Sequence, residues 1–134
     1  HELNSVILNN KKVMLNILFK AASKTLLTFG ENEIGGKLVF ITTLHTWNQK
    51  LNTHVHLHCL VAGGAVSSDG SRWIPCKGNY LFNQRALSQV FRGKFMELMK
   101  KACQRQDLKF AGDFNHRKVW LVAKRNPRRT GRTF

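Results

Sequence analysis

The segment Thr53–Val61, with the sequence THVHLHCLV, constrains the fold more than any other part of the chain. Its three histidines alternate with apolar residues, and successive side chains of a β-strand point to opposite faces of the sheet. The pattern therefore predicts a strand in which His54, His56 and His58 share one face. The apolar residues between and after them would then point the other way, into a core.

This row of histidines is also a candidate metal site. Neighbouring residues on one face of a strand lie about 6.5–7 Å apart. That spacing allows two imidazoles to converge on one cation at metal–nitrogen distances of about 2.0–2.1 Å, and imidazole is the commonest metal ligand of proteins. We therefore predict a metal site formed by at least two of the three histidines. The alternative is that they are polar residues on a half-exposed sheet face.

A second strand is predicted just before the histidine strand. Residues 37–44 are mostly β-branched or aromatic, which favours a strand, and His45 follows at its end. The polar loop at 50–53 is too short for a crossover helix, so the two strands should be antiparallel neighbours. This arrangement would bring His45 and Gln49 near the start of the histidine strand.

Helical periodicity marks the regions on either side of these strands. Apolar residues recur at three- and four-residue steps over about 10–29 and about 84–106, which predicts two long amphipathic helices. A short helix is expected at about 4–8. Gly30 is a candidate stop for the first long helix, and Asn83 is a suitable N-cap for the second.

The remaining segments complete an α+β fold. Residues 65–74 have the pattern of a β-hairpin with Asp69 and Gly70 in its turn, and 119–123 (VWLVA) should form a last strand. The order of elements predicts one antiparallel sheet covered by the two long helices.

Charge is the most informative property of the composition. The chain has 22 basic and 7 acidic residues and a net charge of +15, so nucleic acid is the default partner. A merely soluble basic protein and a protein of anionic membrane surfaces are the alternatives, but no basic amphipathic helix dominates. No apolar run approaches the roughly 20 residues of a membrane span. The three cysteines are far apart and form no C-x-x-C pair, which favours a reducing cytoplasm over a disulfide framework.

Four ordered motifs carry a resemblance to a known family. They are H-T-W-x-Q at 45–49, H-x-H-x-H-C at 54–59, the Gly63-Gly64 pair, and S-x-D-G-S-R-W at 67–73. With these motifs the chain resembles the two-tyrosine HUH transposases of the insertion-sequence-91 type, relatives of rolling-circle replication initiators and Helitron proteins. The match runs nearly end to end and fades after Ala123.

The resemblance implies cleavage and joining of single-stranded DNA at transposon ends in the bacterial cytoplasm, in association with the nucleoid. In HUH enzymes two histidines around one hydrophobic residue bind a divalent cation, usually magnesium or manganese. That motif maps onto His56 and His58, with His54 as a third ligand or outer partner and His45 or Gln49 completing the shell. The cation polarises the scissile phosphate, and a tyrosine attacks it to form a 5′-phosphotyrosine. Nitrogen ligands suit manganese better than magnesium.

Basic residues outside the histidine strand are candidate contacts to the DNA. The outer face of the helix at 84–106 carries several, and such a face is more often simply solvated. The candidates for DNA contact are Lys50, Arg72, Arg92 and Lys94.

The chain also departs from the family pattern. The family's helix with paired tyrosines, of the form Y-L-x-R-Y-T-H-R, is absent, and the single tyrosine, Tyr80, is interpreted as a core or rim aromatic and not as the nucleophile. The cysteine-rich zinc module and the first strand, which would precede His1, are absent too. We therefore expect residues 1–123 to be a partial HUH catalytic domain, incomplete at both ends. Residues 124–134 are expected to be a basic, disordered tail that is out of frame.

Two functions remain open on the sequence. The first is a transposase fragment that binds metal and single-stranded DNA and is catalytically incomplete without the tyrosine helix, so that no catalytic residue is assigned. The alternative is a non-catalytic nucleic-acid-binding module or a pseudogene remnant.

Overall fold

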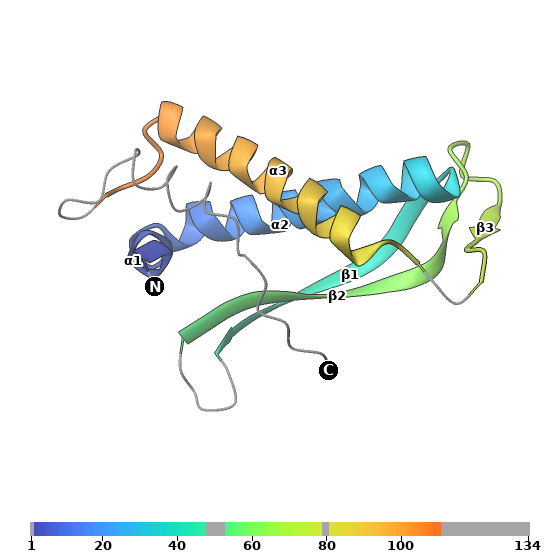
Figure 1. Cartoon of the computed structure of the whole chain (residues 1–134), viewed down its shortest axis with the longest axis horizontal. Coiled ribbons are helices and arrows are strands. Elements are labelled where there is room, and N and C mark those ends of the chain that lie inside the picture. The colour runs from blue at the N-terminus through green and yellow to red at the C-terminus, as the bar shows by residue number, and fades with distance from the viewer. Residues whose placement is uncertain (1, 48–52, 79–80, 111–134) are drawn as a thin grey trace. The chain divides into compact units, whose positions relative to one another are not determined.

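The computed structural model describes residues 2–47, 53–78 and 81–110 (Figure 1). The chain divides into two compact units, one formed by residues 18–95 and the other by 1–17 together with 96–134. In chain order the elements are α1 (Glu2–Asn9), α2 (Lys11–Phe29), the π-helical turn η1 (Gly30–Ile34), β1 (Lys37–Trp47), β2 (Thr53–Val66), β3 (Trp73–Pro75) and α3 (Gln84–Gln104). The predicted strand at 119–123 and the tail at 124–134 lie outside the described residues.

A three-stranded antiparallel sheet forms the centre of the 18–95 unit, with strand order β1-β2-β3. The prediction that the first two strands are antiparallel neighbours is confirmed. Their register places Leu38 opposite Ala65 and His45 opposite His56. β3 then pairs with the end of β2, so the predicted hairpin is also present.

The two faces of this sheet have different environments. Along β1 the odd-numbered residues from Val39 to Trp47 are exposed, whereas the even-numbered residues from Phe40 to Thr46 are half-buried. The half-buried face of the sheet is the one covered by helices: within the 18–95 unit, the second half of α2 and the first half of α3 lie on the same side of the strands (Figure 1). The predicted α+β arrangement, an antiparallel sheet covered by two long helices, is thus confirmed.

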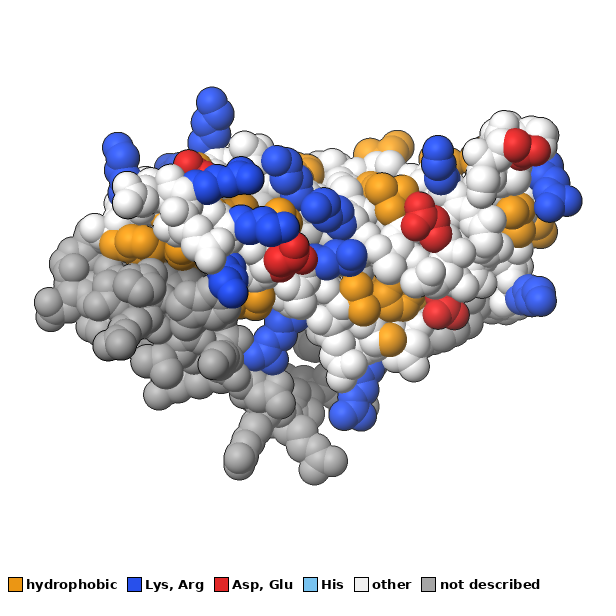
Figure 2. Space-filling view, turned by 90° about the horizontal axis from the view of Figure 1, so that it is seen from above, with side chains coloured by type: hydrophobic (Ala, Val, Ile, Leu, Met, Phe, Trp, Pro, Cys, Tyr) orange, Lys and Arg blue, Asp and Glu red, His pale blue; other side chains and the backbone are white. Residues whose placement is uncertain are grey.

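The outer surface of these helices is basic. In the view onto α2 and α3, Lys and Arg side chains outnumber Asp and Glu (Figure 2). The sequence of α2 contains no acidic residue, and that of α3 contains only Glu97, which pairs with Lys101 at 2.6 Å. The helix side is therefore a positively charged surface.

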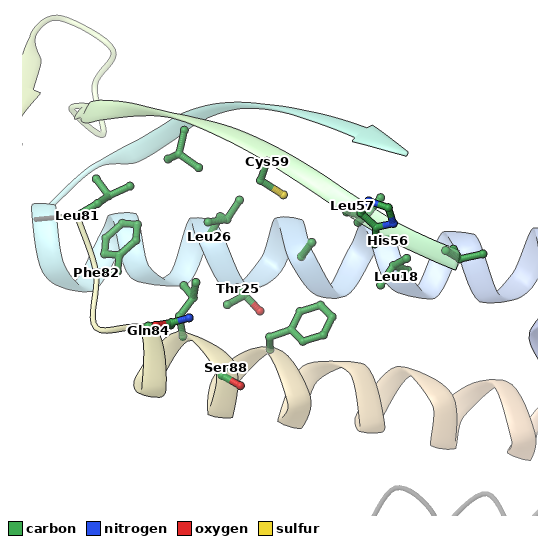
Figure 3. Close-up of a pocket in the computed structure, with 15 residues that line it drawn as sticks. Leu18, Thr25, Leu26, His56, Leu57, Cys59, Leu81, Phe82, Gln84 and Ser88 are labelled. Carbon is green, nitrogen blue, oxygen red and sulfur yellow. The ribbon is translucent and has the colours of Figure 1, made fainter. Parts of the chain in front are cut away.

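A cavity of about 560 Å³ separates the sheet from the helices in the 18–95 unit (Figure 3). Its wall is mostly apolar: Leu57 and Cys59 of β2 face Leu26 of α2 and Phe91 of α3 across it. The sequence pattern assigned Leu57 and Cys59 to the inner face of the strand, and their place on this wall agrees with that assignment. His56 also lines the cavity, whereas His54 and His58 are not among its lining residues (Figure 3).

α2 ends at Phe29, as predicted, but the chain remains helical beyond it. Gly30 begins the π-helical turn, which ends at Ile34 and has Gly35 as its C-cap with φ at 86°. The Gly35 N–H donates to the Gly30 carbonyl at 2.9 Å, and the Gly36 N–H donates to the same oxygen at 3.2 Å. Left-handed backbone at Gly35 explains the stop, since residues with a Cβ rarely adopt it. At Gly30 there is no room for a side chain, because a Cβ there would lie 2.7 Å from Leu38 Cγ.

The turn between β2 and β3 is organised by one carboxylate. Asp69 accepts hydrogen bonds from the Ser67 hydroxyl, from the Ser71 hydroxyl at 2.7 Å and from the Ser71 N–H at 3.1 Å. Ser67 Oγ in turn accepts the Arg72 N–H at 3.1 Å. These bonds, led by that from Ser67, lower the pKa of Asp69 to about 2, because they favour the charged form.

We expect this turn to make stability depend on pH in the acid range. Since the folded-state pKa of Asp69 is depressed, its stabilisation is complete above the unfolded pKa of about 3.9 and is lost as pH falls toward 2. The Asp69→Asn variant should therefore have a lower Tm than the parent at pH 6, and the gap should close between pH 4 and 2. Thermal unfolding of both proteins across that pH range measures the difference in Tm. A difference in Tm that is independent of pH contradicts this role of Asp69.

The other unit is built around a buried asparagine. Asn10, at the junction of α1 and α2, donates from Nδ2 to the carbonyls of Val6 at 2.9 Å and Lys109 at 2.7 Å. Its Oδ1 accepts the Lys109 N–H at 2.6 Å. The side chain thereby pairs with both backbone groups of Lys109 and ties the segment after α3 to the α1–α2 junction. The buried side chains of Val6, Met14, Met99 and Leu108 belong to the same unit.

α3 begins and ends close to the predicted positions. Asn83 Oδ1 accepts the Ala86 N–H at 3.0 Å, which confirms the predicted N-cap. The helix ends at Gln104, near the predicted residue 106. None of the helices in the described ranges is long and apolar enough to cross a membrane.

Candidate metal centre

Three histidines from two strands meet on the exposed face of the sheet. His45 comes from β1, and His56 and His58 come from β2. The ring nitrogens that could bind a metal all lie within 4.8 Å of one another. The register explains the cluster, because His45 pairs directly with His56 and Thr43 pairs with His58. We call His45, His56 and His58 the histidine triad.

Hydrogen bonds orient the central ring of the triad. His56 Nδ1 lies 3.0 Å from the His54 carbonyl oxygen. Because a carbonyl oxygen only accepts, Nδ1 carries the proton in this bond, and the Nε2 of neutral His56 is an acceptor. That Nε2 lies 3.0 Å from His58 Nε2. A backbone acceptor that fixes the tautomer of a histidine is the usual outer support of a metal-binding imidazole.

The donor set fits a divalent cation. Two nitrogens bound to one ion at about 2.1 Å and at right angles are about 3.0 Å apart, which is the separation between His56 Nε2 and His58 Nε2. Two ligand atoms on opposite sides of one ion lie at most about 4.2 Å apart. The ligand nitrogens of the triad lie within 4.8 Å of one another, so the His45 nitrogen would have to move by less than about 1 Å to bind the same ion. Imidazole nitrogens suit iron, nickel, copper or zinc better than magnesium. Exposure of His45 and His58 leaves room for another ligand.

The structure groups the candidate ligands differently from the sequence pattern. His54 shares the strand, and its ring centroid lies 4.8 Å from that of His56, but its nitrogens are not part of the triad. Its backbone carbonyl contacts His56 instead. His45, proposed from the sequence only as a completing ligand, lies opposite His56. The candidate Gln49 lies outside the described residues, as do Lys50 and Tyr80.

The described candidates for DNA contact lie away from the triad. Val66, at the end of β2, lies eight residues along the strand from His58, or about 26 Å. Arg72 is exposed in the turn that follows Val66. Arg92 and Lys94 are half-exposed on the half of α3 that covers the opposite face of the sheet. These three side chains therefore do not take part in the triad.

Comparison with known proteins now gives the class of the protein. Residues 40–128, which include the whole triad, match the profile of a family described as "Putative transposase". The chain belongs to this family, the transposases of the insertion-sequence-91 type, and the resemblance found in the sequence is confirmed.

A curated relative supports the same assignment. The putative transposase y4qJ of Sinorhizobium fredii is 39% identical over 111 residues, which cover 81% of this chain and 28% of the relative. The chain thus spans little more than a quarter of the length of that protein. No solved structure matches the chain.

Proposed function

We propose that this chain is the cation-binding part of a transposase that nicks and joins single-stranded DNA. The observation that carries the proposal is the histidine triad, whose ligand nitrogens lie within 4.8 Å of one another on an exposed sheet face. A divalent cation bound there would draw negative charge from a DNA phosphate and make the phosphorus more electrophilic. Family membership supports DNA as the partner.

The chain's own residues supply binding and orientation in this proposal. His45, His56 and His58 hold the cation, and the His54 carbonyl keeps the His56 ring turned with Nε2 toward it. The donor set favours manganese over magnesium. No residue is proposed as the nucleophile, and Tyr80 is not assigned that role. A HUH-type fold, location in the cytoplasm and association with the nucleoid are parts of the same proposal.

The positive charge supports binding of a polyanion. A net charge of +15 attracts DNA independently of sequence, and Lys50, Arg72, Arg92 and Lys94 are the proposed contacts. Because the described members of this set lie away from the triad, they would hold flanking DNA and contribute mainly salt-dependent affinity. A non-catalytic nucleic-acid-binding module would have only this salt-dependent affinity for DNA, and a divalent cation would not change it.

Binding of single-stranded DNA should therefore have a cation-dependent component. At constant ionic strength, Mn²⁺ should tighten binding of a labelled oligothymidylate about tenfold relative to EDTA, equivalent to about 1.4 kcal/mol. The His56→Ala/His58→Ala double variant should lose this gain and keep the affinity measured in EDTA. Fluorescence anisotropy gives both values. Equal affinities of the parent in Mn²⁺ and EDTA would support the non-catalytic module instead.

A nicking assay addresses the nucleophile separately. With Mn²⁺ and single-stranded DNA, we expect this chain to form no covalent protein–DNA adduct, since Tyr80 is its single tyrosine and is not proposed to attack. An adduct that disappears in Tyr80→Phe would overturn that view and assign the nucleophile to Tyr80.

A further inference from the structure

We propose that Ile41 and Leu60 form an apolar shelf that seats a base of single-stranded DNA next to the phosphate held at the histidine triad. The inference rests on the proposed function, because it assumes that DNA lies at the triad. It adds a contact to the bases, which neither the cation nor the basic residues provide.

The shelf lies on the same face of the sheet as the triad. Ile41 pairs with Leu60, Thr43 with His58 and His45 with His56, so these are three successive rows across β1 and β2. Ile41 is 66% exposed and Leu60 is 74% exposed. Two large aliphatic side chains that stand side by side in solvent beside a metal site mark a surface for an apolar partner.

The spacing fits one nucleotide. Successive rows on one face of a strand are about 6.5–7 Å apart, so the shelf lies one row beyond His58 and two rows beyond His45. One nucleotide of an extended strand spans about the distance of one row. A phosphate at the triad therefore places the adjoining base over Ile41 and Leu60, where burial of apolar surface is favourable.

Charge favours DNA over a second copy of the chain as the occupant. Each copy carries a net charge of +15, so bringing two copies together face to face is opposed by their repulsion. A DNA strand has the opposite charge and carries apolar base faces. Since every base has such a face, the shelf would hold DNA with little preference for sequence.

A matched pair of ligands tests the shelf. Oligothymidylate and an all-abasic oligomer of equal length carry the same phosphates, and only the first has bases. In Mn²⁺ the parent protein should prefer oligothymidylate, and Ile41→Thr/Leu60→Thr should lower that preference at least about fivefold, in the range of one base contact. Affinity for the abasic oligomer should stay unchanged. Threonine preserves the preference for strand structure.

Controls separate the shelf from the proposed function. Leu27→Gln removes another exposed leucine, on α2, and should leave the preference unchanged. Leu60→Thr alone provides a second readout if the double variant does not fold, as judged by circular dichroism.

A shelf variant that keeps the parental preference for oligothymidylate overturns the shelf even when binding still depends on Mn²⁺. Binding that does not depend on Mn²⁺ overturns the proposed function and the shelf with it. A parent that is dimeric and becomes monomeric in the shelf variant assigns this face to a second copy and also overturns the shelf.

Discussion

Replacing His45 with Ala is expected to lower the affinity for Mn²⁺ at least about 100-fold, the upper end of what loss of an outer partner costs a metal site. His45 is part of the triad, and one of its ring nitrogens lies within 4.8 Å of one nitrogen each of His56 and His58. Its loss would leave two imidazoles to hold the ion. Calorimetric titration with Mn²⁺ measures the change directly.

His54→Ala is the matched control for this result. The substitution removes an imidazole from the same strand but keeps the backbone carbonyl that contacts His56 Nδ1 at 3.0 Å. We therefore expect the affinity for Mn²⁺ to change less than about threefold, well within 1 kcal/mol. The opposite ranking of the two variants would make His54 the third ligand.

Asn10→Ala should produce the largest loss of stability among substitutions outside the apolar core. The change removes three hydrogen bonds, at 2.9, 2.7 and 2.6 Å. It also deprives both backbone groups of Lys109 of their partner. A net value of about 1 kcal/mol for each bond predicts a decrease of about 2–4 kcal/mol in the free energy of unfolding. Urea denaturation followed by circular dichroism measures it.

Asn16→Ala provides the comparison for that measurement. Asn16 lies on the same helix as Lys11 and Ile17, and its side chain is exposed. Substitution at an exposed position of this kind usually changes stability by less than about 0.5 kcal/mol. If Asn10→Ala costs no more than Asn16→Ala, the buried amide does not stabilise this unit.

Much of the fold could be predicted from local sequence. Alternation in the histidine strand gave both its extended structure and the separation of its faces, and the short loop before it required an antiparallel neighbour. The turn at Asp69 and the cap at Asn83 followed from residue types that form the same local hydrogen bonds in most proteins. These features depend on residues close together in the chain.

The composition of the triad could not be predicted in the same way. Alternation placed His54, His56 and His58 on one face, but His54 and His58 are two rows, or about 13 Å, apart along a strand. A directly opposite residue on the neighbouring strand lies only about 4.5–5.5 Å away. The register of β1 and β2 pairs His45 with His56. The length of the loop between the strands does not by itself predict that register.

Helix α2 shows a second limit. The three- and four-residue spacing of apolar residues predicts a buried face of Leu15, Leu18, Phe19, Ala22, Leu26 and Phe29. Ala22, Leu26 and Phe29 are buried, but Leu15, Leu18 and Phe19 are only half-buried. In the first half of the helix Met14 and Ile17 are buried instead, because apolar residues occur around most of this helix and periodicity alone does not select the face there. The role of Asn10 depends on Lys109, almost a hundred residues later, and no local pattern predicts such a contact.

The histidine triad is most directly tested by locating the metal. Crystals of the chain grown with MnCl₂ should show an anomalous difference peak about 2.0–2.3 Å from one nitrogen each of His45, His56 and His58. A peak bound by His54 in place of His45 would contradict the assigned ligands. If the three rings show no peak at a Mn²⁺ concentration that saturates the tightening of DNA binding, the triad is not the cation site.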